Sequence, residues 1–223
     1  MGAGSVGDPL ATTTETDAED HRPRPLRDTL RMRGELIALV GTSSVGKTSV
    51  SEALQPLLPH PHLVVGIDLF LNMFPQHWAG HPRGPGPGMW YHDTVDPDGS
   101  PRARIHYGSA GKALLTGMPA AVRALLDCGN HVILDEMPLD EPILPAWRRE
   151  LAEYRVTWIR LSAPLSVIEQ REARRTRGQH LGNARGHFLI GADDHYDVQV
   201  DVATKSVDAA AREIATVLSG RAA

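Results

Sequence analysis

The chain has 223 residues, 41% of them hydrophobic and 22% charged, which is the composition of an ordinary globular protein long enough for one full α/β core. The formal net charge of −4 argues against general nucleic-acid binding, which needs a positive field to displace counterions. No apolar run reaches the roughly 18 residues of a membrane span, and the single cysteine, Cys128, excludes an intrachain disulfide framework. We therefore expect no membrane span, a cytoplasmic location and a small, buried Cys128 side chain.

The first segment, residues 1–31, is rich in Gly, Thr, Asp, Pro and Arg. It contains no apolar stretch of the kind found in secretory signals. Such a composition buries too little surface to offset the entropy lost on ordering. We expect a flexible N-terminal tail followed by one domain, residues 32–223.

A phosphate-binding loop follows the first predicted strand, residues 35–40. Residues 41–48 read Gly-Thr-Ser-Ser-Val-Gly-Lys-Thr and match the pattern G-x-x-x-x-G-K-[ST]. Gly41 and Gly46 allow the backbone N–H groups to curl around phosphates, Lys47 adds a positive charge, and Thr48 is a Mg²⁺ ligand. We expect nucleotide contacts from Gly41, Ser43, Ser44, Val45, Gly46, Lys47, Thr48 and Ser49.

The context of this loop supports the assignment. An apolar stripe along residues 50–58 predicts a helix that starts at the loop and ends near Pro56 and Pro59. Its N-terminus would direct free N–H groups at the phosphates. The alternative is an inert Gly/Ser turn, which has no need for Lys47 and Thr48. The sequence therefore predicts that the chain binds a nucleoside triphosphate.

Carboxylates end the next two predicted strands. Residues 63–67 form a strand ending at Asp68, which can act as the base or orienting acceptor for a substrate hydroxyl. The alternative is that Asp68 only caps a helix starting near Leu69. Residues 131–134 form a strand ending at Asp135 and Glu136. Asp135 is the predicted Mg²⁺ or substrate ligand, and the same roles are open to Glu136. The alternative is that either carboxylate simply accepts a bond from the Lys47–Thr48 region.

Between these strands lies a Pro-, Gly- and His-rich segment, about 69–107, that we expect to be irregular. We interpret residues 70–107 as a substrate-binding insert, because an apolar pocket is the simplest use for so many aromatic side chains. The alternative is that the aromatics pack the insert onto the sheet. The six aromatic residues are Phe70, Phe74, Trp78, Trp90, Tyr91 and Tyr107. The spacing of the four histidines, His77, His81, His92 and His106, matches no zinc template.

The second half alternates helix, strand and helix. Helices are predicted at 114–126 and 146–154, a strand at 155–161, and an Arg-rich helix from 165 to about 175. Its arginines are Arg171, Arg174, Arg175 and, beyond its end, Arg177. Together with Gly178, Gly182 and Gly186 they suggest a mobile lid at about 171–187 that brings guanidinium groups to the phosphates. The alternative is a solvated face pairing with Glu169 and Glu172. We select Lys47 and Arg175 as catalytic together with Asp68, and Arg171 as nucleotide-binding.

A fifth strand, 198–202, and a final helix capped by Ser206 complete the pattern. Alternating strands and helices predict a three-layer α/β fold: a five-stranded parallel sheet covered by helices on both faces. Ligands of such sheets bind beyond the carboxyl ends of the strands. This rule places the phosphate loop, Asp68 and Asp135 on one rim.

Taken together, these segments resemble the chloramphenicol phosphotransferase-like family of P-loop kinases. The similarity runs through residues 41–48, 66–68, 132–136, 171–175 and 196–201 and spans about 36–218. It implies the P-loop NTPase fold and ATP-dependent transfer to a hydroxyl of a small antibiotic, with Asp68 as the base and Arg175 in the lid. The chain departs from the family in its tail and in the insert at about 75–105, where the acceptor should bind. A nucleoside antibiotic is therefore as plausible an acceptor as chloramphenicol.

Our main hypothesis is an ATP- and Mg²⁺-dependent O-phosphotransferase that confers resistance by modifying a hydroxylated small molecule. One alternative is a nucleotide-dependent regulatory NTPase acting on a protein partner, and another is a metabolic nucleoside or sugar kinase. Hydrolysis without an acceptor would favour the regulatory protein. The sequence leaves the acceptor and the oligomeric state open.

Overall fold

The computed structural model describes residues 1–2, 33–79, 84–176 and 178–222. The predicted tail, residues 1–31, lies almost wholly outside these ranges, as do His81 and Arg177, so the predictions made for them are not tested.

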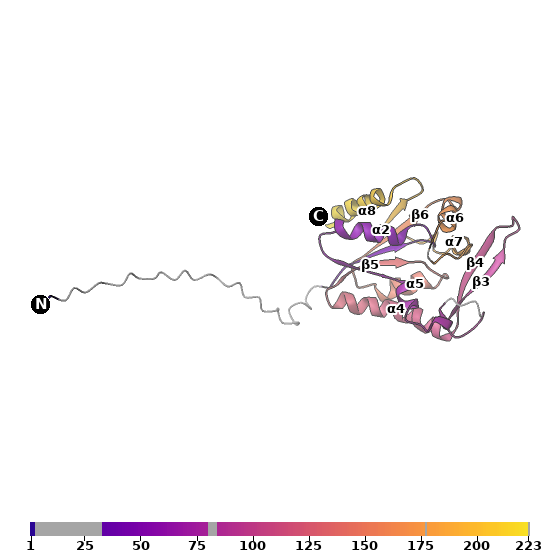
Figure 1. Ribbon diagram of the computed structural model, residues 1–223, viewed down its shortest axis with the longest axis horizontal. Coiled ribbons are helices and arrows are strands. Elements are labelled where there is room, and N and C mark those ends of the chain that lie inside the picture. Colours follow the sequence, from indigo (N-terminus) through magenta and orange to yellow (C-terminus); the bar gives the residue numbers. More distant parts are fainter. Residues whose placement is uncertain (3–32, 80–83, 177, 223) are drawn as a thin grey trace.

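A five-stranded parallel sheet forms the centre of the molecule (Figure 1). Its spatial order is β2-β5-β1-β6-β7. The strands are β1 (Leu36–Val40), β2 (His62–Gly66), β5 (His131–Glu136), β6 (Val156–Ser162) and β7 (Val198–Asp201). Every residue of β1 is buried, as expected for a continuous apolar strand between two neighbours. The predicted parallel sheet is confirmed.

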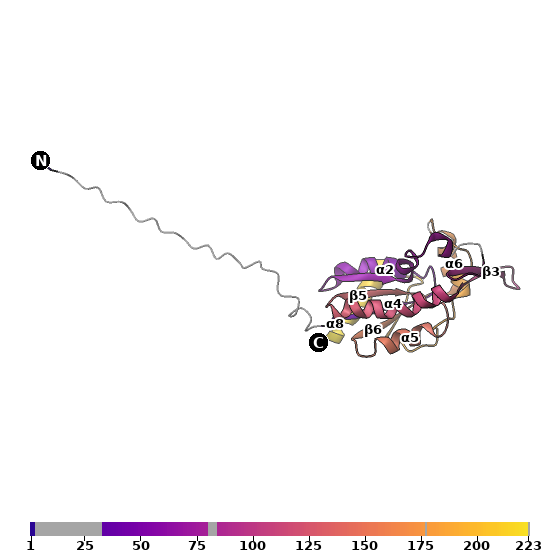
Figure 2. The ribbon, with the colours of Figure 1, turned by 90° about the horizontal axis from the view of Figure 1, so that it is seen from below.

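Helices cover both faces of the sheet, so the predicted three-layer fold is also confirmed. One face carries α2 (Lys47–Leu54), α6 (Leu165–Ala173) and α8 (Val207–Ala222), which pack on an apolar cluster around Leu39 and Ile133. The short η1 (Gln55–Leu57) continues directly from α2. The other face, toward the viewer in Figure 2, carries α4 (Ser109–Asp127) and α5 (Ile143–Glu150) over Val132 and Leu134. Ser206 caps α8, because its Oγ accepts from the Ala209 amide at 3.2 Å.

The segment expected to be irregular is mostly regular, and that prediction was wrong. It contains α3 (Ile67–Leu71), η2 (Gln76–Trp78) and an antiparallel hairpin of β3 (Met89–Val95) and β4 (Pro101–Tyr107). The turn is closed by the Asp96 amide donating to the Ser100 carbonyl at 2.9 Å, with Gly99 at φ +82°. The Pro- and Gly-rich run before the hairpin hid its strand pattern. In Figure 1 the hairpin projects beyond the carboxyl-end rim of the sheet.

The predicted lid packs against this hairpin through α7 (Asn183–Gly186). The Ala103 amide donates to the Gly182 carbonyl at 2.9 Å, and Arg104 donates to the Gly186 carbonyl at 3.1 Å. Gly186 is required by this approach, since a Cβ there would lie 1.8 Å from the Ala103 carbonyl oxygen. The insert and the lid are thus joined to each other.

The structure also bears on two smaller expectations, about membrane spans and about Cys128. Within the described part of the chain, none of the helices has both the length and the apolar character that a bilayer crossing requires. The Cys128 side chain was expected to be buried and is exposed, because it follows the last turn of α4 at the surface.

Candidate active site

The phosphate loop has the backbone geometry that its sequence implies. Gly46 takes φ +112° at the start of α2, and Ser44 takes φ +62°, in the left-handed region that few residues with side chains adopt. Gly41 packs against β6, where a Cβ would lie 2.8 Å from the Leu161 carbonyl oxygen. The loop between them faces a cavity of about 1000 Å³.

Most of the predicted site residues line this one cavity. They are Ser43, Ser44, Val45, Gly46, Lys47, Thr48, Ser49, Asp68, Asp135, Arg171 and Arg175. Gly41 does not; it lies behind the loop, beside Leu161 and Ala163. The structure therefore gathers residues that are up to 132 positions apart, while their individual roles stay predictions.

Lys47, Thr48 and Asp135 form a polar group at the floor of the cavity. The Thr48 hydroxyl donates to Asp135 Oδ2 at 2.6 Å, and Lys47 Nζ lies 3.6 Å from Asp135 Oδ1. Lys47 also donates to the Thr42 carbonyl at 3.1 Å. The parallel pairing of β1 with β5 creates this contact, because it brings the end of β5 beside the strand that leads into the loop.

These oxygens fit a magnesium ion. Mg²⁺ takes hard oxygen ligands in a compact octahedron, usually from one or two protein oxygens, substrate phosphates and water. The Thr48 hydroxyl and an Asp135 carboxylate oxygen, 2.6 Å apart, supply such a pair beside the phosphate loop.

Asp68 lies in the first turn of α3 rather than at the end of a strand. The sequence placed its strand one residue too far, since β2 ends at Gly66 and the helix begins at Ile67. Gly66 is required there, because a Cβ would meet the Asp135 carbonyl oxygen at 2.8 Å. The Asp68 carboxylate is exposed on the cavity wall. The N-cap of α3 is Gly66 and no side chain caps this helix, so the alternative that Asp68 only caps a helix was wrong.

The two selected arginines behave differently. Arg175 Nη1 lies 3.4 Å from the Ser43 hydroxyl and 3.5 Å from the Ser44 hydroxyl, directly over the phosphate loop. Arg171 instead donates to the Val45 carbonyl at 3.0 Å and to the Val202 carbonyl at 2.6 Å. Arg175 thus contacts the side chains of the phosphate loop, whereas Arg171 ties the loop to the end of β7.

A buried carboxylate anchors the segment predicted to be a lid. Glu172 is buried and accepts from the Gly182 and Ala184 amides, both at 2.8 Å. Glu169 pairs with Arg185 at 2.6 Å. The alternative interpretation paired Glu169 and Glu172 with arginines at helical spacing. Their carboxylates instead contact the segment that includes Gly182, Ala184 and Arg185.

Of the six aromatic residues in the insert, Tyr91 lines the cavity. Its pKa is raised, first by burial and then by the nearby Asp68 charge, while Arg175 opposes the rise. Phe70, Phe74 and Tyr107 pack into the core cluster beneath the insert, which was the alternative interpretation. Tyr91 also stacks on His180 of the lid at 3.6 Å between ring centroids.

The sequence interpretation did not predict that the Glu136 carboxyl group is completely buried. Its side chain is 0% exposed, and neither carboxylate oxygen has a hydrogen-bond partner among the described residues. Burial raises its pKa to about 8; Lys47 opposes the rise, Asp135 adds to it, and the Trp147 indole opposes it weakly. Period-two alternation could have revealed this, since Glu136 shares a strand face with Val132 and Leu134.

The family of the chain is visible in comparisons with known proteins. The sequence model of a family described as "Chloramphenicol phosphotransferase-like protein" matches residues 34–219. A protein of Mycobacterium tuberculosis, provisionally named an O-phosphotransferase and found in two strains, is 32% identical over 185 residues. The matched region spans 81% of this chain and 80% of that protein.

Solved structures support the fold. A sugar kinase from Janibacter sp. superposes with a TM-score of 0.57 at 16% identity, covering 83% of this chain and 95% of that one. The APS kinase CysC of M. tuberculosis, complexed with AMPPNP and APS, gives 0.52 at 20% identity and covers 84% and 99%. The tunicamycin resistance protein of Deinococcus radiodurans gives 0.51 at 18% identity and covers 83% and 96%. At these identities the similarity concerns the fold alone.

Proposed function

We propose, because this chain belongs to the chloramphenicol phosphotransferase-like family, that its cavity transfers the γ-phosphate of ATP to a hydroxyl of a small-molecule antibiotic or related metabolite. Its membership of this family and its similarity to the O-phosphotransferase show that the chain is a small-molecule kinase acting on hydroxyl groups. The identity of donor, metal and acceptor is the proposed part. It rests on one observation: the Asp68 carboxylate is exposed on the same cavity as the phosphate loop.

The donor half is the phosphate loop with its charged neighbours. The loop amides and Lys47 bind the ATP phosphates, and Arg175 stabilises the charge that spreads over the transferring oxygens. Mg²⁺ held by Thr48 and Asp135 would neutralise phosphate charge when bound. Most of the rate enhancement then comes from positioning and fixed charge, as in other phosphoryl transfers.

The acceptor half is the wall formed by α3 and the hairpin. Asp68 orients the acceptor hydroxyl and takes its proton as that oxygen bonds to the γ-phosphorus and the bond to the bridging oxygen breaks, which releases ADP. Tyr91, Ile105 and Met137 give this side an amphipathic lining suited to a compact hydroxylated molecule. We place the reaction in the cytoplasm, where ATP is available.

The test is ATP consumption against a panel of hydroxylated antibiotics, nucleosides and sugars, with mass detection of an added phosphate. Asp68→Asn should retain ATP binding and lose about 10²–10⁴-fold in transfer, the usual contribution of a positioned base. Asp193→Asn is the matched control, because Asp193 is exposed and lies outside the cavity lining. Full transfer by Asp68→Asn would remove Asp68 from the mechanism. Hydrolysis without any phosphorylated acceptor would favour a regulatory NTPase.

A further inference from the structure

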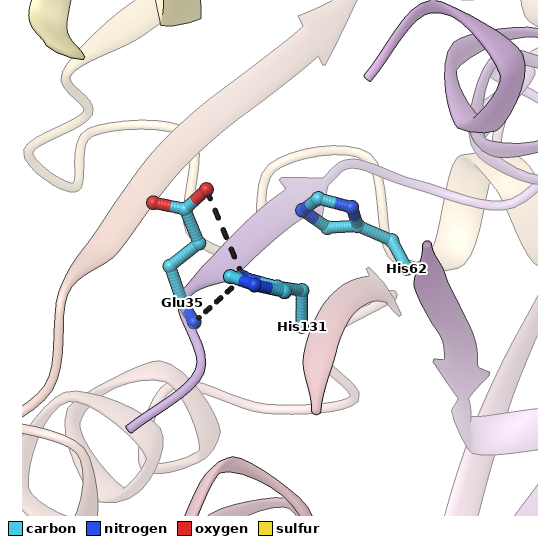
Figure 3. A group of neighbouring side chains, drawn as sticks. All are labelled: Glu35, His62 and His131. Atoms are coloured by element: carbon cyan, nitrogen blue, oxygen red, sulfur yellow. Dashed lines mark hydrogen bonds and ion pairs between the residues drawn. The ribbon is translucent and has the colours of Figure 1, made fainter. Parts of the chain in front are cut away.

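A row of polar side chains crosses the sheet at the rim opposite the phosphate loop. Three strands begin there: β2 at His62, β5 at His131 and β1 just after Glu35. His62 and His131 are register partners, and Leu36 pairs with Val132, so Glu35 stands beside His131 in the same row. Arg155 extends the row on the far side, since Leu36 also pairs with Val156. Figure 3 shows the three central side chains turned toward one another.

His62 presents a free nitrogen lone pair to this group. Its Nδ1 lies 2.7 Å from the His60 carbonyl oxygen, which can only accept, so Nδ1 carries the proton. Nε2 of the neutral ring is then unprotonated, and it has no hydrogen-bond partner among the described residues. The residue is 4% exposed. In Figure 3 the unpartnered side of the ring faces Glu35 and His131.

His131 is also unprotonated at the nitrogen that faces Glu35. Its Nδ1 accepts a long hydrogen bond from the Glu35 amide at 3.2 Å, so the single lone pair of this nitrogen is engaged, and metal binding would exchange this long bond for the metal. It lies 3.8 Å from Glu35 Oε1. Arg155 approaches the second carboxylate oxygen, Oε2, at 3.6 Å, which leaves Oε1 toward the histidines.

We propose that Glu35, His62 and His131 bind one zinc-class divalent cation, with water as the fourth ligand. One ligand atom from each residue lies within 4.8 Å of the others. Tetrahedral zinc with bonds of about 2.0–2.2 Å keeps its ligands roughly 3.3–3.6 Å apart, so closure needs side-chain adjustments of about 1 Å. Two imidazoles and one carboxylate suit zinc rather than Mg²⁺, which prefers oxygen ligands. The Nδ1–H bond of His62 to a backbone carbonyl is the usual support of a metal-binding histidine.

The site has a structural role. It lies at the amino ends of the strands, whereas the phosphate loop follows the carboxyl end of β1. The ion would fasten three strands whose ligands are far apart in sequence and would relieve the unpartnered His62 nitrogen. Binding to the folded state alone raises stability as the ion concentration exceeds its dissociation constant.

The test is zinc binding by the full chain, measured by equilibrium dialysis in excess Mg²⁺ to occupy the nucleotide site. One equivalent of Zn²⁺ is expected, together with a rise in melting temperature of about 5–10 °C at 100 times the dissociation constant. Glu35→Gln, which keeps the side-chain shape, and His62→Gln should each weaken binding at least about 100-fold. His195→Ala is the control, because His195 is exposed and lies outside the group.

The zinc-binding results for the wild-type chain and its variants either support the site or overturn it. Binding of one equivalent that is lost in both variants and retained in the control supports the site. Absence of zinc binding by the wild-type chain overturns it, as does binding that Glu35→Gln and His62→Gln leave unchanged. Retention of circular-dichroism signal by Glu35→Gln separates loss of a ligand from loss of the fold.

Discussion

Glu136 makes the stability of this protein depend on pH in an unusual direction. The ordinary pKa of the group is 4.5, and in the folded chain it is about 8. Between these values the unfolded chain releases a proton that the folded chain keeps. The contribution of Glu136 to the free energy of unfolding is therefore greatest below pH 4.5 and falls as pH rises toward 8. Each unit of difference corresponds to about 1.4 kcal/mol, so the shift removes about 5 kcal/mol in total.

Glu136→Gln removes this dependence, because an amide of the same shape cannot ionise. The free energy of unfolding of the variant minus that of the wild type should rise by about 1.4 kcal/mol per pH unit between pH 5 and pH 8. The assay is urea unfolding at several pH values in that window. Any constant cost of burying the amide cancels, since the slope is what is compared.

The matched control is Glu52→Gln, at an exposed position of α2. It leaves the buried carboxyl in place, so its curve should run parallel to the wild type. A difference between Glu136→Gln and the wild type that stays constant from pH 5 to pH 8 would refute the reasoning. It would mean that Glu136 ionises in the folded protein without cost.

Three further changes test other contacts. Thr48→Ala removes the hydroxyl bonded to Asp135, so a Mg²⁺ titration of ATP consumption should shift at least about tenfold toward higher Mg²⁺; an unshifted curve would exclude Thr48 as a ligand. Glu172→Gln replaces a buried carboxylate, which accepts hydrogen bonds from two backbone amides, by a weaker acceptor. It should lower the free energy of unfolding in urea by about 1–3 kcal/mol, and equal stability would contradict the anchoring role of Glu172. Gly186→Ala forces α7 away from the Ala103 carbonyl and should cost about 1–3 kcal/mol while increasing limited proteolysis of residues 171–187; an unchanged cleavage pattern would show that the close approach is relaxed easily.

The sheet and the phosphate loop could be predicted from the sequence because their signals are local. Five apolar residues leading into two glycines and a lysine specify a buried strand and a loop with little help from the rest of the chain. The hairpin is the counterexample. Its Asp-Pro-Asp-Gly turn at residues 96–99 was visible, yet the surrounding prolines, glycines and histidines suggested irregular structure.

Residues that act over long distances were harder to assign. Arg171 was selected as nucleotide-binding, and it lines the cavity, but the sequence did not show that its guanidinium also meets the Val45 and Val202 carbonyls, which only the fold brings to it. The sequence does not identify Glu35, His62 and His131 as a possible metal site, because their spacing fits no metal template. They become neighbours through strand order and register, which the alternating pattern of strands and helices does not specify.

The position of β1 in the sheet has a consequence for how the protein forms on the ribosome. Its two hydrogen-bonded neighbours begin at His131 and Val156, so β1 leaves the ribosome long before either partner. Until β5 emerges, five apolar residues stay without a sheet to join. Pairings this distant in sequence form slowly and expose the nascent chain to aggregation. A fragment ending before His131 should therefore depend on chaperones, and the nucleotide site should be completed only near the end of synthesis.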